Sequence, residues 1–412
     1  MINKRAGPRA TGIVLTTALA LLGAAGSAHA GIAGGVTAQP GGSCALAGCF
    51  HLEPAIVFSA TRDTPGATTP GTAAAAAEIY LMNPGTTNPR RLTSNAVGDG
   101  FATLSPDGKR IVFDRMTTGV CGGKTWSNIS DLWVMDADGS NQRFLARGSS
   151  AAWSPDGKDI AFHASASYYA SGGQASGCPI KANPGAATTD SDIFVANVDD
   201  LLAGAGQPRN ITGTPGLIED DADWSPAATT APHGQRIVFT AHPATDNPNV
   251  SNQAEIYVTN PDGSFRQQLT SNLEEERAAA WSPDGTAIVY SCRIGGGMNT
   301  FQICVMNADG TNVQQLTGDS VPNLTATWSP DGQHIVFNKL LPPLPPAFPG
   351  EVLNYQLFTL TQNPDGTWSG AEEITCAPQQ NTPGYPNPCP AGVTPTPGIN
   401  LAADWGMLRV KN

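Results

Sequence analysis

One short motif, Trp-Ser-Pro-Asp-Gly, recurs along this chain and constrains what the chain can fold into. Its five copies lie at residues 104–108, 153–157, 224–226, 281–285 and 328–332. The first copy has Leu104 in place of Trp, and the third ends after Pro226. Each copy opens a block of similar content, so the chain is an array of one repeated unit.

The block that begins at Phe101 shows how one unit folds. Its Ser105–Gly108 segment predicts a tight turn, because Pro presets φ, Asp caps its own backbone and Gly tolerates positive φ. The β-branched and aromatic runs at 111–113 and 132–135 predict two strands, and Phe144 opens a last one. The unit is therefore four short antiparallel strands, named A, B, C and D in chain order.

The other blocks repeat this pattern. Strand B is expected at 56–58, 111–113, 160–162, 237–239, 288–290 and 335–337. Strand C is expected at 79–81, 132–134, 193–195, 256–258, 303–305 and 357–359. Strand D is expected to end at 92–93, 145–146, 211–212, 269–270, 316–317 and 374–375. Strands B, C and D thus occur six times, whereas the turn motif occurs five times.

The missing strand A lies at the other end of the chain. Residues 402–406 match residues 221–225 and then the pattern stops, while the first block has no strand A of its own. We therefore expect an all-β, six-bladed β-propeller in which the C-terminal strand completes the first blade, because ring closure leaves only short, protected edges. The expected blades span 51–95 with 400–410, then 98–147, 148–213, 219–271, 275–318 and 323–376.

The residue two positions before each Trp of strand A, or before Leu104 in the first copy, is always alanine. These alanines are Ala102, Ala151, Ala222, Ala279, Ala326 and Ala403. Strand A is innermost in a propeller, where neighbouring blades converge and only a small side chain fits. The recurrence supports a closed ring rather than an open stack of sheets.

The turn, the Ile-Val-Phe strand, the Ile-Tyr-Val strand and the Asn-Ala-Asp-Gly turn together resemble the TolB-type (WD40-like) β-propeller repeat. The resemblance covers residues 51–412 and implies a propeller that serves as a periplasmic binding scaffold. TolB itself carries an α/β domain before its propeller, whereas only about twenty Gly- and Ala-rich residues, 31–50, precede the first block here. A role in the Tol–Pal system is therefore not implied.

The first thirty residues have the pattern of a signal peptide. Lys4, Arg5 and Arg9 precede an apolar run from Ile13, and residues 28–30 form a small-residue cleavage site. Cleavage would take three from the 22 Lys and Arg residues, leaving 19 against 34 acids and a net charge of −15. We expect a periplasmic or secreted monomer without a membrane span, and this charge disfavours nucleic acid as a partner.

All eight cysteines follow the cleavage site, and an even number in an oxidising compartment predicts disulfides. The expected pairs are Cys44–Cys49, Cys121–Cys178, Cys292–Cys304 and Cys376–Cys389, although the spacing alone permits other pairings. The alternative is a metal site, which the lack of any Cys-x-x-Cys pair disfavours.

The B–C loops and D–A links share one face of the predicted ring, and their lengths vary widely, so this face is the candidate binding surface. Five positions before each aromatic, the links carry Asp99, Gly148, Glu219, Glu276, Asn323 and Asn400. Nearby acids are Asp220, Asp221, Asp223, Glu274, Glu275 and Asp404. We expect Asp99, Glu219, Asp223, Glu276, Asn323, Asn400 and Asp404 to bind a ligand at the channel mouth. The ligand would be Ca²⁺ or the amine of a basic peptide; the alternative is a solvated acidic rim.

Catalytic motifs are weak. The chain has no Gly-x-Ser-x-Gly and no His-Glu-x-x-His, and we expect no cofactor other than the Ca²⁺ considered above. His163 and His242 both follow strand B and would meet across a blade boundary, but a third metal ligand is not apparent. The favoured function is non-catalytic binding of an envelope or extracellular protein, a peptide or a glycan. The alternatives are a propeller enzyme, such as a polysaccharide lyase or hydrolase that uses the channel mouth, and a purely structural module.

Overall fold

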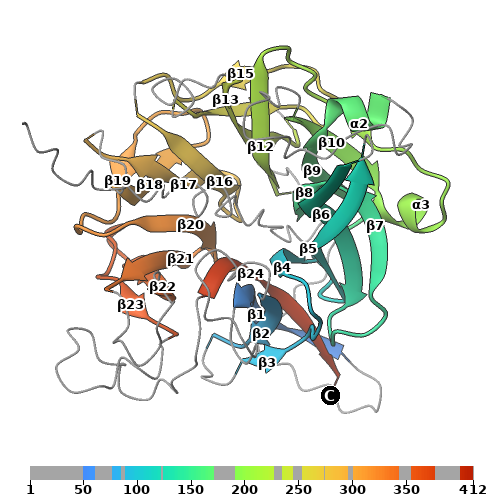
Figure 1. Ribbon diagram of the computed structural model, residues 1–412. Coiled ribbons are helices and arrows are strands. Elements are labelled where there is room, and N and C mark those ends of the chain that lie inside the picture. Colours follow the sequence, from blue (N-terminus) through green and yellow to red (C-terminus); the bar gives the residue numbers. More distant parts are fainter. Residues whose placement is uncertain are drawn as a thin grey trace, which may run out of the picture.

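The computed structural model describes residues 50–60, 77–84, 89–121, 124–170, 191–226, 234–244, 253–272, 274–295, 300–342, 354–375 and 400–411. Six four-stranded antiparallel sheets stand around a common axis, which confirms the predicted six-bladed propeller (Figure 1). From the axis outward, the strands of blade 1 are β24 (Asn400–Lys411), β1 (Phe50–Ala60), β2 (Glu78–Met82) and β3 (Arg90–Arg91). Blade 2 comprises β4 (Asp99–Leu104), β5 (Arg110–Cys121), β6 (Lys124–Asp136) and β7 (Arg143–Arg147). Blade 3 comprises β8 (Ser149–Trp153), β9 (Asp159–Ser165), β10 (Ser191–Asn197) and β11 (Arg209–Asn210).

The other three blades follow the same order. Blade 4 comprises β12 (Leu217–Trp224), β13 (Ile237–Pro243), β14 (Glu255–Thr259) and β15 (Gln267–Gln268). Blade 5 comprises β16 (Glu276–Trp281), β17 (Ala287–Arg293), β18 (Phe301–Asn307) and β19 (Gln314–Gln315). Blade 6 comprises β20 (Asn323–Trp328), β21 (His334–Leu341), β22 (Asn354–Thr361) and β23 (Glu372–Glu373).

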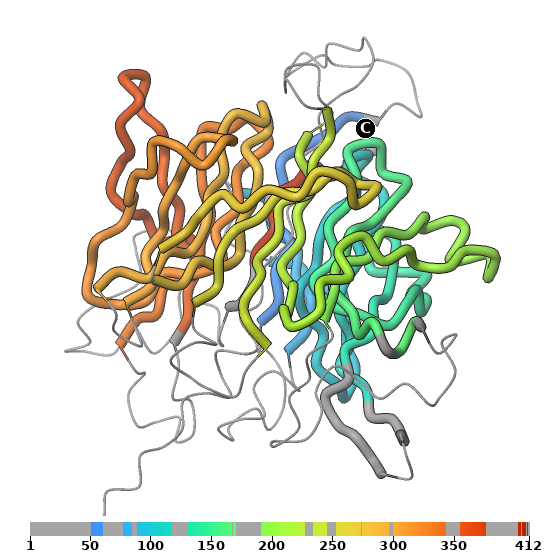
Figure 2. The backbone as a smooth tube through the Cα atoms, turned by 90° about the horizontal axis from the view of Figure 1, so that it is seen from above, coloured from blue at the N-terminus to red at the C-terminus, as the bar shows by residue number. Residues whose placement is uncertain are grey.

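The C-terminal strand closes the ring, as predicted from the residues 402–406. Strand β24 pairs antiparallel with β1 over nearly its whole length, with Gly406 opposite Ala55 and Lys411 opposite Phe50. The two ends of the described chain therefore lie side by side in one blade, red against blue in Figures 1 and 2. Closure gives blade 1 the strand A that its own sequence block lacks.

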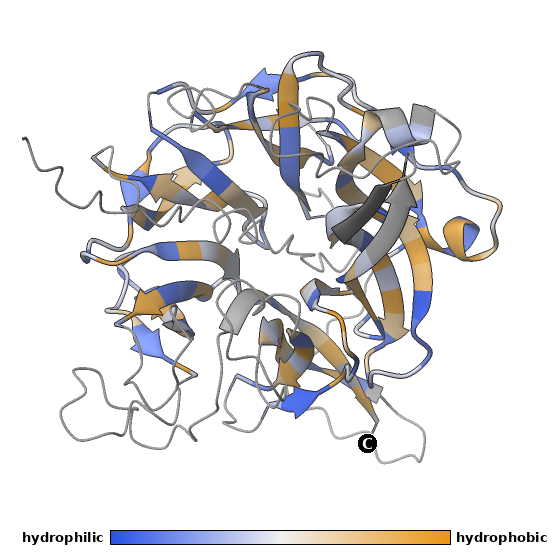
Figure 3. Ribbon diagram, in the orientation of Figure 1, coloured by the Kyte–Doolittle hydropathy of each residue, from blue (hydrophilic) through white to orange (hydrophobic). Residues whose placement is uncertain are grey.

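The hydrophobic core consists of six clusters, one at each blade-to-blade interface. The apolar stretches of the strands, orange in Figure 3, supply these clusters. Each of the six recurrent alanines is at most 2% exposed and packs against strand B of the preceding blade, as Ala102 does against Val57 and Ala326 against Val289. The predicted reason for small residues at this position is confirmed.

Strand A carries a bulge at the same place in each blade, where the register of pairing with strand B shifts. In five blades the bulge residue is described and has positive φ: Phe101, Ser150, Asp221, Ala278 and Thr325. The bulge turns its N–H toward the preceding blade. The Ser150 N–H donates to the Asp114 carboxylate at 3.1 Å, and the Thr325 N–H donates to Ser291 Oγ at 3.0 Å. In these two blades the residue that follows strand B's apolar run, Asp114 or Ser291, thus accepts a hydrogen bond from the next blade.

A threonine at the end of strand D fixes the link into the next blade. Its hydroxyl oxygen accepts from the first apolar N–H of strand C in five blades, at 2.8–2.9 Å. These threonines are Thr93, Thr212, Thr270, Thr317 and Thr375. Blade 2 has Ala146 at this position and lacks the bond. The repeated bond holds the start of each link against its own blade.

Blade 3 departs from the all-strand pattern. A short helix, α2 (Ala166–Ala170), follows β9, and another, α3 (Val198–Leu202), replaces the short turn expected between strands C and D. Asn197 caps α3, because its side chain accepts from the Asp200 N–H at 3.1 Å, and Val198 is buried. Among the described helices none is long and apolar enough to cross a membrane.

One predicted disulfide is confirmed. Cys292 in β17 and Cys304 in β18 are bonded, with their Cα atoms 5.8 Å apart, and they staple strands B and C of blade 5. The other predicted pairs, Cys44–Cys49, Cys121–Cys178 and Cys376–Cys389, involve residues or side chains outside the described part of the chain. The signal peptide and the segment 31–49 also lie outside it.

Candidate functional site

The predicted binding residues lie at equivalent places in their blades. Asp99, Glu276, Asn323 and Asn400 are the first residues of β4, β16, β20 and β24, and Glu219 is the third residue of β12. The side chains of Asp99, Glu219, Glu276 and Asn323 are buried, at 0–3% exposure. A solvated acidic rim, the alternative expectation, is therefore wrong for these four residues. The Asn400 side chain lies outside what the structure describes, and the role of the whole set in binding stays a prediction.

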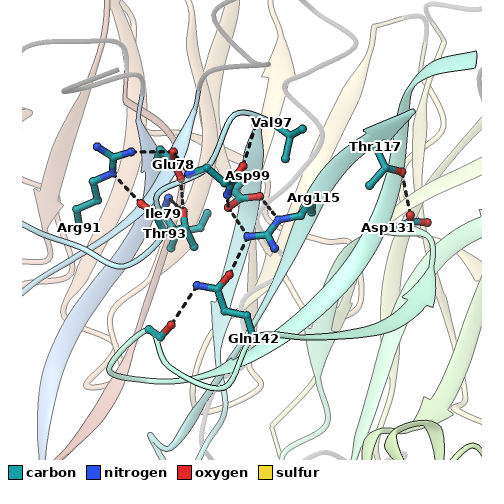
Figure 4. A network of polar contacts seen from close by, with 12 residues as sticks. Glu78, Ile79, Arg91, Thr93, Val97, Asp99, Arg115, Thr117, Asp131 and Gln142 are labelled. Carbon is teal, nitrogen blue, oxygen red and sulfur yellow. Dashed lines mark hydrogen bonds and ion pairs between the residues drawn. The ribbon is translucent and has the colours of Figure 1, made fainter. Parts of the chain in front are cut away.

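Asp99 is held by charge within blade 2. Arg115 in β5 donates from Nε to Oδ1 at 2.7 Å and from Nη2 to Oδ2 at 2.8 Å, and Asn95 adds a bond at 2.7 Å (Figure 4). The guanidinium also donates to Gln142 at 2.9 Å and lies 4.6 Å from the centroid of the Trp133 ring. Because both carboxylate oxygens are engaged in this ion pair, Asp99 is the member of the set most fully occupied by the protein itself.

Only one of the two carboxylate oxygens of Glu219 accepts a hydrogen bond from the residues that the structure describes. Arg266 donates to Oε1 at 2.5 Å, and its guanidinium lies 4.8 Å from the Tyr257 ring. The other oxygen, Oε2, is buried and accepts no hydrogen bond from any residue that the structure describes. Burial raises the pKa of Glu219, against the opposing effect of Thr212 and Arg266.

Glu276 and Asn323 repeat this arrangement in the next two blades. Asn272 donates to Glu276 Oε1 at 2.7 Å, and the amide of Asn323 donates to Gln302 at 2.9 Å and to Asp319 at 3.1 Å. Glu276 Oε2 and Asn323 Oδ1 are buried and accept no well-aligned hydrogen bond from the described residues, although Thr270 and Glu255 lie close to the Glu276 carboxyl. Burial raises the pKa of Glu276 to about 8, and the neighbouring Glu255 adds to the rise. Blades 4, 5 and 6 thus present three oriented acceptors at one position.

Asp223 and Asp404 come from blades 4 and 1, which face each other across the ring (Figure 1). Each precedes the aromatic of strand A, and each accepts an N–H of the next blade: Oδ2 of Asp223 from Trp281 at 2.8 Å, and Oδ2 of Asp404 from Leu104 at 3.0 Å. Burial raises the pKa of Asp223 well above its usual value, and the negative charge of Asp404 adds to the rise. The two carboxylates therefore join blades and lie close enough to influence each other.

A further polar cluster lies between blades 4 and 5; its acids and His242 were named from the sequence, whereas its arginines, Arg277 and Arg293, were not. Glu275 accepts from both Arg277 and Arg293. Burial raises the pKa of Asp220 well above its usual value, with Asp221 adding to the rise, whereas burial and Arg277 lower the pKa of His242 to about 4. The sequence does contain one indication of this cluster: His242 and Arg293 occupy equivalent positions in blades 4 and 5, because each is the fifth residue after the isoleucine of strand B.

His163 does not extend this cluster into a metal site. Its Nδ1 is buried without a hydrogen bond among the described residues, and burial lowers the pKa of its imidazole, against the effect of Asp221. Within the described ranges no three His, Cys, Asp or Glu side chains are grouped as metal ligands. Most of the B–C loops that were predicted to form the binding face, including 171–190 and 343–353, lie outside those ranges.

No protein-family model and no curated protein sequence matches the chain. Among solved structures, TolB from Acinetobacter baumannii is similar, with 15% identity and a TM-score of 0.53 over 85% of this chain and 66% of that one. Hydrazine synthase from Kuenenia stuttgartiensis is also similar, with 14% identity and a TM-score of 0.53 over 88% of this chain and 47% of that one. This chain therefore spans about two thirds of the TolB chain and less than half of the synthase chain. These likenesses show a TolB-like propeller fold, in one case in a protein named as an enzyme.

Proposed function

We propose that this chain is an exported, non-catalytic binding protein. Its TolB-like propeller would hold a cationic peptide segment of an envelope or extracellular protein at the strand A ends of blades 4–6. One observation carries the proposal: Glu219 Oε2, Glu276 Oε2 and Asn323 Oδ1 are buried at equivalent positions and accept no hydrogen bond from the described residues. The Cys292–Cys304 disulfide supports an oxidising compartment, periplasmic or extracellular.

The arrangement favours a donor-rich ligand for a physical reason. In each of the three residues one side-chain group is bonded inside the protein, which fixes the direction of the second oxygen. A buried acceptor that has no hydrogen bond destabilises the protein by about 1–3 kcal/mol. An ammonium or guanidinium group of a ligand would remove that cost, and the net charge of −15 expected after cleavage of the signal peptide would speed its approach.

The raised pKa of Glu276 gives the proposal a measurable signature. With a pKa of about 8, this carboxyl is mostly protonated at pH 7. A cation favours the ionised form, so its binding must release a proton and must strengthen as the pH rises from about 6 to 9. A neutral glycan would show no such dependence.

The test is fluorescence anisotropy with a labelled Lys- and Arg-containing peptide and with its acetylated, uncharged counterpart. Glu276→Gln and Glu219→Gln should each weaken binding of the charged peptide at least about tenfold, since one lost charge-assisted bond is worth about 1.5 kcal/mol or more. Glu372→Gln, an exposed acid on strand D, is the matched control. Equal affinity for both peptides, or for all variants, would contradict the proposal.

A second candidate function is an enzyme of the polysaccharide lyase or hydrolase type. The cluster between blades 4 and 5 favours it, because a carboxyl with a raised pKa (Asp220), a neutral imidazole (His242) and a guanidinium (Arg277) suit general acid–base chemistry. Incubation with uronate polymers, followed by measurement of new reducing ends, tests it. Turnover that is lost in both Asp220→Asn and His242→Gln would replace the binding proposal.

A further inference from the structure

Blade 4 contains a buried arginine that forms no ion pair with any residue that the structure describes. Arg236 immediately precedes β13 and is 7% exposed. Its Nε and Nη1 atoms are buried and donate no hydrogen bond to the residues that the structure describes. The guanidinium instead lies over the Phe265 ring, 4.0 Å from its centroid. Burial lowers the pKa of this group from its usual value, but an arginine remains charged at neutral pH.

The equivalent arginine of blade 2 is paired. Arg110 precedes strand B in the same way, and it donates to Asp199 at 2.8 Å and to the Gly157 carbonyl at 3.1 Å while lying over Trp153. The position in the repeat therefore does not require an unpaired cation. In a chain with 34 acids against 22 Lys and Arg residues, a cation that is left without an anion is unexpected.

Phe265 itself is an unusual residue at its position. It lies in the C–D turn of blade 4 with a φ of 51°, where blades 2 and 5 have Asn141 and Asn312, each with a φ of 55°. Asparagine tolerates this left-handed conformation, whereas a bulky aromatic residue rarely adopts it. The residue is nevertheless 51% exposed, and Arg236 lies over its ring. Two locally unfavourable features, an unpaired cation and a strained aromatic residue, thus meet in one contact.

We propose that Arg236 and Phe265 form a receptor for a carboxylate on the C–D turn face of blade 4. The guanidinium would donate parallel N–H groups to the two carboxylate oxygens, a geometry that arginine matches with its planar fork. The exposed face of the phenyl ring would pack against the apolar part of the ligand next to its carboxylate. In an antiparallel blade the A–B and C–D turns lie at the end opposite to the B–C loops, so this receptor is separate from the peptide site proposed above.

Calorimetric titration of the intact chain tests the proposal with two carboxylate probes, the peptide acetyl-Gly-Glu-Gly-amide and sodium glucuronate. Their uncharged counterparts, the Gln peptide and glucose, are the controls. Binding of either carboxylate probe, with a loss of at least tenfold in affinity in Arg236→Met and a smaller loss in Phe265→Asn, supports the receptor and identifies the source of the carboxylate. Failure of both probes, or unchanged binding in Arg236→Met, overturns it.

Stability measurements separate a binding role from a structural one. Arg236→Met removes a buried, unpaired cation and should raise the melting temperature, and Phe265→Asn restores the residue that suits the turn and should do the same. Arg110→Met, which removes paired contacts at the equivalent position, should not raise it and should leave probe binding unchanged. A lower melting temperature in Arg236→Met would assign Arg236 to the structure and overturn the proposal.

Discussion

Asp404 in the last strand accepts a hydrogen bond through Oδ2 from the backbone N–H of Leu104, at 3.0 Å, and a second from Thr103 Oγ1, at 3.2 Å. A residue near the C-terminus of the chain thereby holds the end of β4, the first strand of the second blade, 300 positions earlier. The contact adds to the pairing of β24 with β1 and to the cluster around Ala403. The final strand belongs to two blade interfaces at once.

Truncation after residue 399 should therefore abolish the cooperative unfolding of the whole ring, not only of blade 1. Without β24, strand β1 exposes its inner edge and the interfaces of blade 1 with blades 2 and 6 lose their strand A side chains. Calorimetry of the truncated chain should show a broad or absent transition. Removal of residues 411–412 alone, at the outer end of β24, should leave a single transition, and a full-length-like melt of the longer truncation would disprove closure by the tail.

The C–D turns provide a prediction with an internal control. A β-carbon on Gly310 would stand 2.7 Å from the Leu269 carbonyl oxygen of the preceding blade, whereas a β-carbon on Gly366 would meet nothing within 4 Å. The two glycines have nearly equal φ values, 86° and 84°. Alanine at either site costs about 1–2 kcal/mol for the left-handed backbone, and Gly310→Ala should cost roughly 1–3 kcal/mol more because it forces two blades apart.

Urea unfolding of Gly310→Ala and Gly366→Ala measures this difference. Equal midpoints in the two variants would show that the turn does not bear on the neighbouring blade. An unchanged m value in both would confirm that the denatured state is unaffected.

The sequence predicted the blades, the ring closure and the alanine positions because these depend on local or strictly repeated features. The turn at Ser105–Gly108 depends on adjacent residues alone, and an alanine recurs in each strand A two positions before the Trp, or before Leu104. Contacts between blades were harder to foresee. The bonds from Trp281 to Asp223 and from Leu104 to Asp404 depend on how blades sit against each other, which no spacing within one block reveals.

The same limit applies to the candidate site. Sequence position gathered Asp99, Glu219, Glu276 and Asn323 correctly at equivalent strand starts, but it could not show that they are buried. Their partners come from other elements: Arg115 from strand B, Arg266 from the C–D turn and Asn272 from the D–A link. The asparagine four positions earlier recurs, as Asn95 for Asp99 and Asn272 for Glu276. The arginine partners come from different elements in different blades, so the repeat pattern carries no information about them.

The stability that the buried carboxyls Asp114 and Glu276 contribute should fall as the pH rises from about 4 to about 8, whereas His242, with its lowered pKa, acts in the opposite direction up to about pH 6.5. Burial raises the pKa of Asp114 to about 7, against the bonds from Ser149, Ser130 and Ser150, and that of Glu276 to about 8. A carboxyl whose pKa is higher in the folded state than in the unfolded state binds its proton more tightly when folded. Its contribution to the free energy of unfolding is therefore complete below the unfolded pKa of about 4. That contribution is lost as the pH rises through the folded pKa. For Asp114 the loss amounts to a few kcal/mol, at about 1.4 kcal/mol per pH unit.

Chemical unfolding at intervals between pH 4 and pH 8 measures the slope. Asp114→Asn, which cannot ionise, should lose less stability than the wild type between pH 4 and pH 8 and be the more stable protein at pH 8. Asp138→Asn is the control, because hydrogen bonds from Ser140 lower the pKa of this exposed carboxyl and its titration lies below the range. If the unfolding free energy of the wild type relative to Asp114→Asn stays constant or increases from pH 4 to pH 8, the assigned direction is refuted.

Arg115→Met should be the most damaging single charge change in blade 2. Its loss leaves Asp99, which is 1% exposed, as a buried carboxylate without its cation, and breaking such a pair costs about 3–5 kcal/mol. Lys158→Met is the control, because the Lys158–Asp156 pair is exposed on both sides and worth about 0–1 kcal/mol. In the double variant Arg115→Met with Asp99→Leu, most of the loss in unfolding free energy should be recovered, since no buried charge remains. If the double variant is as unstable as Arg115→Met alone, the damage comes from lost packing of the guanidinium on Trp133 rather than from the unpaired carboxylate.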